Sequence, residues 1–260
     1  MNGECMSKKG IIIFDMDDTL VNREDVYTKA QKFLLKTLKK YGAKKIDINK
    51  SISVLRKIDY KLVTLHKGEF MYDYKELAKA LWLYYVEEKS LTEACHMAFQ
   101  EGKRGICFKP AVEAAEKHNQ ILKTTIPKLK KNAFEVLKKL QRSYVLLLLS
   151  VGNIDIQKRV IDYYKFDRIF DLILIRPRKD INVFKEAKER GAEILARKYS
   201  SSSSNVYVVG DMISQDILFG KCIGAKTIWI PGPYDPCYKE GVSPDYKISD
   251  LSELLEILSP

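Results

Sequence analysis

Apolar residues form two kinds of pattern along this chain, and each pattern predicts a different kind of structure. From about residue 127 onward, short apolar runs alternate with segments whose apolar residues recur at helical spacing. The runs Tyr144–Ser150 and Val206–Val209 are continuous, as is typical of strands that are buried on both faces of a parallel sheet. Val183–Ala196, between them, has the helical pattern. This alternation predicts an α/β domain built from βαβ units.

The same patterns predict the remaining elements of this domain. One more apolar run, Ile11–Phe14, precedes a long helical segment and is expected to be a strand. Further strands are expected at Leu172–Ile175 and Thr227–Ile230, and further helices around Ala133–Leu140, after an N-cap at Asn153, at Ser214–Phe219 and at Leu251–Leu258. We therefore expect a Rossmann-like parallel sheet with helices on both faces.

A long insertion with helical character separates Ile11–Phe14 from the other predicted strands. Its first helix has apolar residues at helical spacing, and Gly42 is a natural residue for its end. The apolar positions are Ala30, Phe33, Leu34, Leu38 and Tyr41. We assign residues 1–21 and 127–260 to the α/β core and residues 22–126 to a separate all-helical cap domain. Ligands bind at the carboxyl edge of open α/β sheets, so an insertion after the first strand is expected to act as a lid.

The composition is that of a globular protein with an excess of positive charge. The 260 residues are 46% hydrophobic and 30% charged, and the net charge is +11. Residues 22–126 contain 21 Lys/Arg and 13 Asp/Glu, which accounts for +8 of this charge. The charge suggests either an acidic ligand or a non-specific attraction to nucleic acid. Nucleic acid is an alternative that we do not favour, because no nucleic-acid-binding motif is present.

Aromatic residues gather in one part of the predicted cap, with lysines among them. A pocket for an anionic or aromatic ester, stacking on a nucleic-acid end, and ordinary packing of the cap are three interpretations. The residues are Phe70, Tyr72, Tyr74, Trp82, Tyr84 and Tyr85. Packing is the simplest of the three. Arg23 and Tyr27 are the cap residues that we expect to face the ligand site of the core, since they closely follow the acidic segment Asp15–Asp18.

The cysteines and the apolar runs indicate where the protein acts. The five cysteines are odd in number and scattered, and they have no metal-ligand spacing, which predicts reduced thiols. They are Cys5, Cys95, Cys107, Cys222 and Cys237. The run Ile11–Phe14 is too short for a secretory signal and is followed at once by aspartates, and no run has the length of a membrane span. We predict a cytoplasmic monomer or homodimer.

Three carboxylates follow the first predicted strand directly. Asp15, Asp17 and Asp18 would repel one another at the end of a buried strand and would lose solvation, so they need a cation or strong hydrogen bonds. Mg²⁺ suits them, because it prefers hard oxygen ligands. On this segment alone, an acidic turn that caps the next helix is an equal alternative.

Two more strands end in polar residues. Val206–Val209 runs through Gly210 into Asp211, with Asp216 five residues further on, so two strands that end in aspartate can converge on one ion. The strand Tyr144–Ser150 ends in a hydroxyl and is followed by Gly152 and Asn153 before the next helix. The hydroxyl and the N–H groups at the helix start would suit phosphate oxygens.

Together these residues resemble the haloacid dehalogenase superfamily of hydrolases. The closest likeness is to its phosphatases with a helical cap inserted after the first motif, such as the phosphoglycolate phosphatase-like group. Asp15 to Thr19 matches the DxDxT motif of the family, Ser150 its second-motif Ser/Thr, and Gly210-Asp211 with Asp216 its acidic fourth motif. The order and the placement at strand ends match over the whole chain.

The resemblance implies a role for each of these residues. Asp15 would attack phosphorus and form an aspartyl-phosphate, and Asp17 would act as general acid and base. The implied Mg²⁺ ligands are Asp15, Asp17 through its backbone carbonyl, Asp211 and Asp216, of which Asp216 orients the site or pairs with a lysine. The implied phosphate-binding residues are Thr19, Ser150, Gly152 and Asn153.

The third motif of the family is a lysine before a helix. Lys179 is our choice, because its distance from Phe184 resembles that in family members, and Arg178 and Lys185 are the alternatives. All three histidines lie in residues 22–126, which argues against imidazole-based chemistry in the core. An acid at Asp17 favours phosphatase over dehalogenase activity, since an alkoxide leaving group needs a proton.

The predicted function is Mg²⁺-dependent hydrolysis of a small phosphomonoester through an aspartyl-phosphate on Asp15. A phosphomutase with the same nucleophile is one alternative, because both reactions use the same residues. A non-catalytic basic binding or regulatory protein is another. We do not favour the binding or regulatory protein, because a purely structural role would not need the three mutually repelling carboxylates of Asp15, Asp17 and Asp211.

Overall fold

The computed structural model describes residues 8–67, 73–201, 205–233 and 241–258. Cys5, Cys237, Phe70 and Tyr72, about which the sequence made predictions, lie outside these residues. The chain divides into two compact units, one of Met1–Arg23 with Pro127–Pro260 and the other of Glu24–Ile126.

The first unit contains a six-stranded sheet in which every neighbouring pair of strands is parallel. The order is β5-β4-β1-β6-β7-β8. The strands are β1 (Ile11–Phe14), β4 (Val145–Val151), β5 (Leu172–Arg176), β6 (Val206–Gly210), β7 (Lys226–Trp229) and β8 (Tyr246–Lys247). Strand β1 lies between β4 and β6, so the carboxyl ends of these three strands meet at one edge of the sheet. This confirms the predicted Rossmann-like core.

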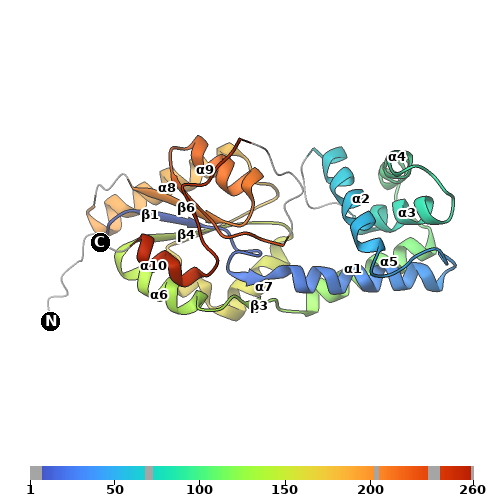
Figure 1. Cartoon of the computed structure of the whole chain (residues 1–260), viewed down its shortest axis with the longest axis horizontal. Coiled ribbons are helices and arrows are strands. Elements are labelled where there is room, and N and C mark those ends of the chain that lie inside the picture. The colour runs from blue at the N-terminus through green and yellow to red at the C-terminus, as the bar shows by residue number, and fades with distance from the viewer. Residues whose placement is uncertain (1–7, 68–72, 202–204, 234–240, 259–260) are drawn as a thin grey trace. The chain divides into compact units, whose positions relative to one another are not determined.

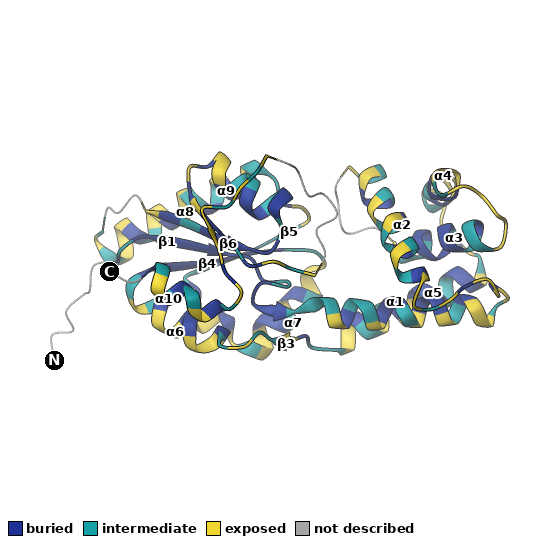
Figure 2. Cartoon of the chain, viewed as in Figure 1, coloured by how far each residue is buried: buried dark blue, intermediate teal, exposed yellow. Residues whose placement is uncertain are grey.

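Helices cover both faces of this sheet (Figure 1), and the alternation of side chains along β1 explains why. Ile12 and Phe14 pack into a core with residues of α6 (Ala133–Ser143), α7 (Ile154–Tyr164) and α10 (Leu254–Ile257). Ile11 and Ile13 point the other way, into a core with residues of α8 (Ile181–Tyr199). Helix α9 (Leu218–Cys222) lies on the face that α8 covers. Strands β1, β4 and β6 are accordingly buried through most of their length (Figure 2).

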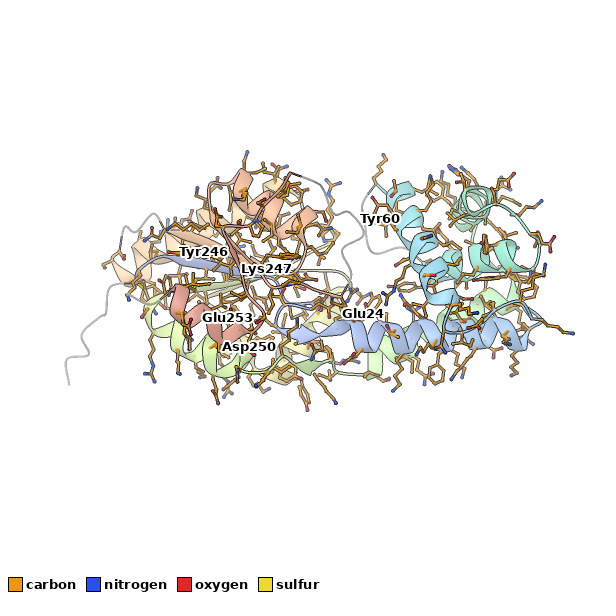
Figure 3. All side chains as sticks on the ribbon, in the orientation of Figure 1. Glu24, Tyr60, Tyr246, Lys247, Asp250 and Glu253 are labelled. Atoms are coloured by element: carbon orange, nitrogen blue, oxygen red, sulfur yellow. The ribbon has the colours of Figure 1, made fainter. Side chains whose placement is uncertain are left out.

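Several elements differ from the sequence-based prediction. The helix expected at Ser214–Phe219 begins as a π-helical turn, Ile213–Ile217, before α9. The closing helix begins as a 3₁₀ turn, Leu251–Glu253, whose N–H groups are capped by a capping box of Asp250 and Glu253, both labelled in Figure 3. The short strands β2 (Val21–Asn22) and β3 (Lys128–Leu129), which pair antiparallel, and the edge strand β8 were not predicted, because two-residue strands leave no periodic pattern.

Helices joined by turns and loops make up the described residues of the second unit. Its helices are α1 (Arg23–Lys40), α2 (Ser51–Leu65), α3 (Tyr74–Tyr85), α4 (Leu91–Gly102) and α5 (Lys109–Thr124). They share a core that includes Leu34, Leu38, Leu62 and Leu81. The helix predicted from the spacing of Ala30, Phe33, Leu34, Leu38 and Tyr41 is α1, although Phe33 is 39% exposed and Leu35 is buried.

The aromatic residues of the second unit take part in its packing. Trp82, Tyr84 and Tyr85 pack against the core of this unit, and the Trp82 ring lies 5.0 Å from that of Phe108, measured between centroids. His118 is buried, and its ring lies 4.2 Å from that of Tyr74. These contacts support the packing interpretation for the described aromatic residues.

Cys95, Cys107 and Cys222 are free thiols in the described part of the chain. Among the described helices, none combines the length and the apolar character that a membrane span requires.

Candidate active site

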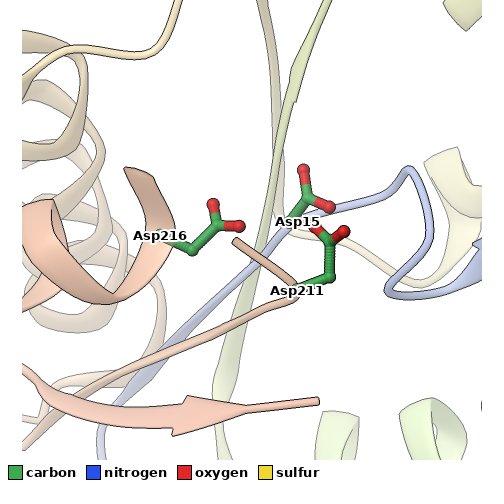
Figure 4. A group of neighbouring side chains, drawn as sticks. All are labelled: Asp15, Asp211 and Asp216. Atoms are coloured by element: carbon green, nitrogen blue, oxygen red, sulfur yellow. The ribbon is translucent and has the colours of Figure 1, made fainter. Parts of the chain in front are cut away.

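Three buried carboxylates converge at the carboxyl edge of the sheet. Asp15 follows β1, Asp211 follows β6, and Asp216 lies in the π-helical turn after β6. Each offers an oxygen within 4.8 Å of an oxygen from the others, and the three side chains face one another in Figure 4. Their exposed fractions are 5%, 7% and 1%. The sequence is responsible for this convergence, because parallel neighbouring strands that end in aspartate present their carboxylates at the same edge.

Two glycines make room for these carboxylates. A Cβ atom at Gly210 would overlap the side chain of Asp216, and a Cβ atom at Gly232 would overlap the carboxylate of Asp211. The backbone N–H of Met212 donates to Asp216 Oδ2 over 3.1 Å. The cluster is thus built into the turn after β6, where π-helical geometry is often found at functional sites.

Lys179 is the cation at the centre of the cluster. Its Nζ lies 2.5 Å from Asp15 Oδ1 and 2.7 Å from Asp216 Oδ1, and its side chain is buried. Burial lowers the pKa of Lys179, but the charges of Asp15 and Asp216 more than reverse this effect and raise the pKa above its usual value. Of the three candidates for the third-motif cation, Arg178 and Lys185 are exposed. Lys179 is the candidate that lies among the carboxylates.

One lysine does not balance three carboxylates. Burial, together with the charges of Asp15 and Asp216, raises the pKa of Asp211 well above its usual value. Burial also raises the pKa of Asp216, to about 6, although the charge of Lys179 opposes this. Without a further cation, the ionised cluster carries an excess of negative charge in a buried place. This environment favours the binding of a cation.

Three buried oxygens at this edge have no hydrogen-bond partner among the described residues. They are Asp15 Oδ2, Thr19 Oγ1 and Ser150 Oγ. Thr19 and Ser150 are both fully buried, at 0% exposure. Buried polar atoms in native proteins are nearly always hydrogen-bonded, so three unsatisfied oxygen atoms at one edge of the sheet indicate that a ligand completes the site.

The donor set fits Mg²⁺. The available atoms are carboxylate oxygens of three buried aspartates, which are hard ligands and lie within 4.8 Å of one another. Asp15, Asp211 and Asp216 could hold the ion with their side chains. The carboxylate of Asp17 is not part of this group, so its predicted contact through the backbone carbonyl stays a prediction.

The carboxylate of Asp17 lies in a different set of contacts. Gln157 Nε2 donates to Asp17 Oδ2 over 2.8 Å, and Arg23 Nε lies 3.3 Å from the same oxygen. Burial raises the pKa of Asp17, Arg23 lowers it, the charge of Asp15 raises it, and the hydrogen bond from Gln157 lowers it. The net shift is upward, which suits a group that must carry a proton near neutral pH. The hydroxyl of Tyr27 lies 3.0 Å from that of Tyr74 within the second unit, and the expectation that Tyr27 faces the site stays a prediction.

Several polar groups of the turn after β4 form hydrogen bonds within the protein. Asn153 is exposed, and its Oδ1 accepts from the N–H groups of Asp155 and Ile156, so it caps α7 as predicted. The N–H of Gly152 donates to the carbonyl of Arg176 over 3.2 Å. The N–H groups of 152, 155 and 156 therefore have partners within the protein. A phosphate contact by Gly152 or Asn153 stays a prediction.

Two residues of the site were missed by sequence reasoning. Gln157 is 4% exposed and lies on the buried stripe of α7 with Val160 and Ile161, so a polar residue at an apolar position was the signal that could have found it. Trp229 donates its indole N–H to the backbone carbonyl of Asp211 over 2.7 Å. Nothing in the sequence distinguishes Trp229 from any other aromatic residue in a strand.

Comparison with known proteins agrees with this arrangement. The family of haloacid dehalogenase-like hydrolases matches residues 10–224. A glyceraldehyde 3-phosphate phosphatase from Pyrococcus furiosus is 25% identical over 257 residues, which cover 97% of this chain and 94% of that protein.

Solved structures share the fold over nearly the whole chain. YfnB from Bacillus subtilis, a haloacid dehalogenase-type hydrolase bound to magnesium, has a TM-score of 0.65 at 20% identity and covers 97% of this chain and 100% of its own. A predicted phosphoglycolate phosphatase from Haemophilus somnus has a TM-score of 0.58 at 15% identity, with 98% and 99% covered.

Proposed function

We propose that this chain, which belongs to the haloacid dehalogenase-like hydrolase family, is a Mg²⁺-dependent phosphatase that hydrolyses a small phosphomonoester through a phosphorylated Asp15. One observation carries the proposal. Asp15 Oδ2, Thr19 Oγ1 and Ser150 Oγ are buried and have no hydrogen-bond partner in the described part of the chain, and they accompany a carboxylate cluster that has an excess of negative charge. A phosphate group and a divalent cation would together satisfy these atoms.

Asp15 is the nucleophile in this proposal. Lys179 bonds its Oδ1, which leaves Oδ2 to attack phosphorus. A bond forms between Oδ2 and phosphorus while the bond from phosphorus to the ester oxygen breaks. When bound, Mg²⁺ supplies positive charge that offsets the charge of the carboxylates and of the phosphoryl oxygens. Lys179 contributes to the same balance, and the hydroxyl groups of Thr19 and Ser150 donate to phosphoryl oxygens.

Asp17 moves the protons. It begins protonated and gives its proton to the departing alkoxide, so the alcohol leaves neutral. The resulting carboxylate then takes a proton from water as the water oxygen attacks phosphorus. Inorganic phosphate leaves, Asp15 is restored as a carboxylate, and Asp17 is again protonated. The raised pKa of Asp17 suits the first step, because burial keeps a proton available.

The substrate class follows from the charge and from the relative. The positive charge of residues 22–126 favours an anionic ligand. The phosphatase from Pyrococcus furiosus is named for glyceraldehyde 3-phosphate, a small phosphorylated molecule. We propose a small phosphorylated metabolite and place glyceraldehyde 3-phosphate and phosphoglycolate first among the esters to test.

Steady-state phosphate release tests the proposal. A panel of phosphomonoesters, with p-nitrophenyl phosphate as a general substrate, is measured with Mg²⁺ and with EDTA. We expect Mg²⁺-dependent release by the wild type and loss of about 10⁴-fold or more in Asp15→Asn, because removal of a nucleophile removes the whole covalent route. The matched control is Asp180→Asn, since Asp180 caps α8 next to Lys179 and lies outside the cluster. Equal release by wild type and Asp15→Asn would refute the proposal.

A further inference from the structure

Gln157 connects the carboxylate of Asp17 to the backbone of the turn after β4. Its Nε2 donates to Asp17 Oδ2 and to the carbonyl of Val151, each over 2.8 Å. The carbonyl of Val151 can only accept, so it dictates the orientation of the amide, and both N–H groups of Nε2 are used. Gln157 is 4% exposed, so water does not compete for these bonds.

The turn has the shape that this contact requires. Gly152 has a φ of +122°, which favours glycine, and a Cβ atom there would lie 3.3 Å from Gln157 Nε2. Val151 directly follows Ser150, whose hydroxyl has no hydrogen-bond partner among the residues that the structure describes. The amide of Gln157 therefore holds Asp17 in a fixed place relative to the backbone that carries Ser150.

The two oxygens of Asp17 are not equivalent. Gln157 Nε2 and Arg23 Nε both approach Oδ2, and no hydrogen bond to Oδ1 is found among the described residues. A hydrogen on Oδ2 would point at N–H groups that can only donate, so a proton on Asp17 belongs on Oδ1. The same two contacts fix the plane of the carboxylate, and with it the direction of that proton.

We propose that Gln157 is a positioning residue that anchors Asp17 through Oδ2, so that Oδ1 is the atom that gives and takes the proton in the reaction. The inference rests on the proposed function, because it assigns a role within that chemistry. Gln157 itself touches neither the substrate nor the reacting atoms in this account. It acts through the orientation of Asp17.

The consequence is a change in leaving-group dependence. A proton in the right place matters for an alkoxide leaving group and matters little for an activated phenolate, which leaves without one. We expect Gln157→Leu to slow the formation of phosphorylated Asp15 from an alkyl phosphate by about 10- to 100-fold, a part of what a general acid contributes. With 2,4-dinitrophenyl phosphate, the burst of phenolate release should change by less than about threefold. Substrate affinity should be unchanged for both.

Two companion variants separate positioning from packing. Gln157→Met keeps much of the length of the side chain but has no N–H group to donate, so it should match Gln157→Leu in the burst experiment. Lys158→Leu changes an exposed residue of the same helix and should behave as the wild type. Unfolding followed by circular dichroism verifies that each variant folds. Full activity of Gln157→Met on alkyl phosphates would overturn the inference in favour of packing.

Crystal structures of wild type and Gln157→Leu with Mg²⁺ provide a readout that does not depend on turnover. We expect the Asp17 carboxylate to rotate or to occupy several orientations in the variant. An unchanged orientation would overturn the inference, whatever the kinetics show. If the wild type hydrolyses no ester, the proposed function fails, and the orientation of Asp17 in the two structures still decides whether Gln157 anchors it.

Discussion

Replacing Lys179 with methionine is expected to destabilise the α/β unit strongly when Mg²⁺ is absent. Methionine keeps much of the volume of the lysine side chain and removes its charge. The variant leaves Asp15, Asp211 and Asp216 buried together without their cation. Removal of one partner from a buried ionic group is costly, because the remaining charges stay desolvated.

The contact distances set the magnitude. At 2.5 and 2.7 Å, each attraction between Lys179 Nζ and a carboxylate oxygen is worth about 6 kcal/mol at an effective dielectric constant of about 20. The desolvation of lysine and the uptake of protons by the carboxylates offset much of this energy, so we expect a net loss of about 3–5 kcal/mol in the free energy of unfolding.

The loss should depend on pH. Asp211 and Asp216 have pKa values raised by burial, and these rise further without Lys179. When the pKa of a carboxyl group is higher in the folded state than in the unfolded state, the folded state binds more protons. The protein therefore loses stability as pH rises from the unfolded pKa through the folded pKa. The variant should therefore lose more stability at pH 8 than at pH 5.

Urea unfolding followed by tryptophan fluorescence measures this loss. The background is Trp82→Phe, because Trp82 lies in the second unit and Trp229 then reports on the first. The matched control is Lys185→Met, since Lys185 is an exposed residue of α8. It should change the free energy of unfolding by less than about 0.5 kcal/mol. Saturating Mg²⁺ should restore part of the loss, since it replaces positive charge. A loss below about 1 kcal/mol, equal to that of Lys185→Met and independent of pH, would refute the reasoning.

Three further predictions follow from the same cluster. Ser150→Ala should lower kcat/KM by about 10- to 100-fold without lowering the melting temperature, because Ser150 Oγ has no hydrogen bond to lose among the described residues. A destabilised variant with normal kinetics would contradict this. Gly210→Ala should lower the free energy of unfolding by about 1–3 kcal/mol and weaken Mg²⁺ binding, because the alanine Cβ would overlap the side chain of Asp216. Urea unfolding measures the first effect and titration calorimetry the second. Unchanged values would be evidence against the close contact of Gly210 with Asp216. Mg²⁺ affinity should fall as pH drops below about 6, where a proton occupies Asp216 in place of the ion, and the raised pKa of Asp211 acts in the same direction. Calorimetry that shows equal affinity at pH 5 and pH 8 would rule this out.

Much of the core was predictable, because its strands are long apolar runs that end in chemically distinctive residues. Ile11–Phe14 is followed by Asp15, and β6 is followed by Asp211. Parallel pairing of β1 with β6 brings these residues to one edge without any further information.

The rest could not be predicted, because it depends on contacts between distant segments. The π-helical turn at Ile213–Ile217 has the same residue types as an α-helical turn, and strand β8 exists through its pairing with β7. In the sequence, Lys179 could be preferred over Arg178 as the third-motif cation only by resemblance to family members. In the structure, Lys179 is buried among the carboxylates and Arg178 is exposed. Gln157 reads as one polar residue on a helix until its partner, 140 positions away, is known.

The most direct test of the central claim is to trap the phosphoryl group on Asp15. Enzyme that is turning over a good ester with Mg²⁺ is quenched, reduced with borohydride and digested, and the peptide that contains Asp15 is examined by mass spectrometry. The account predicts conversion of Asp15 to homoserine, which requires Mg²⁺ and substrate. Turnover without any modification of Asp15, or modification of another residue in its place, would contradict the account.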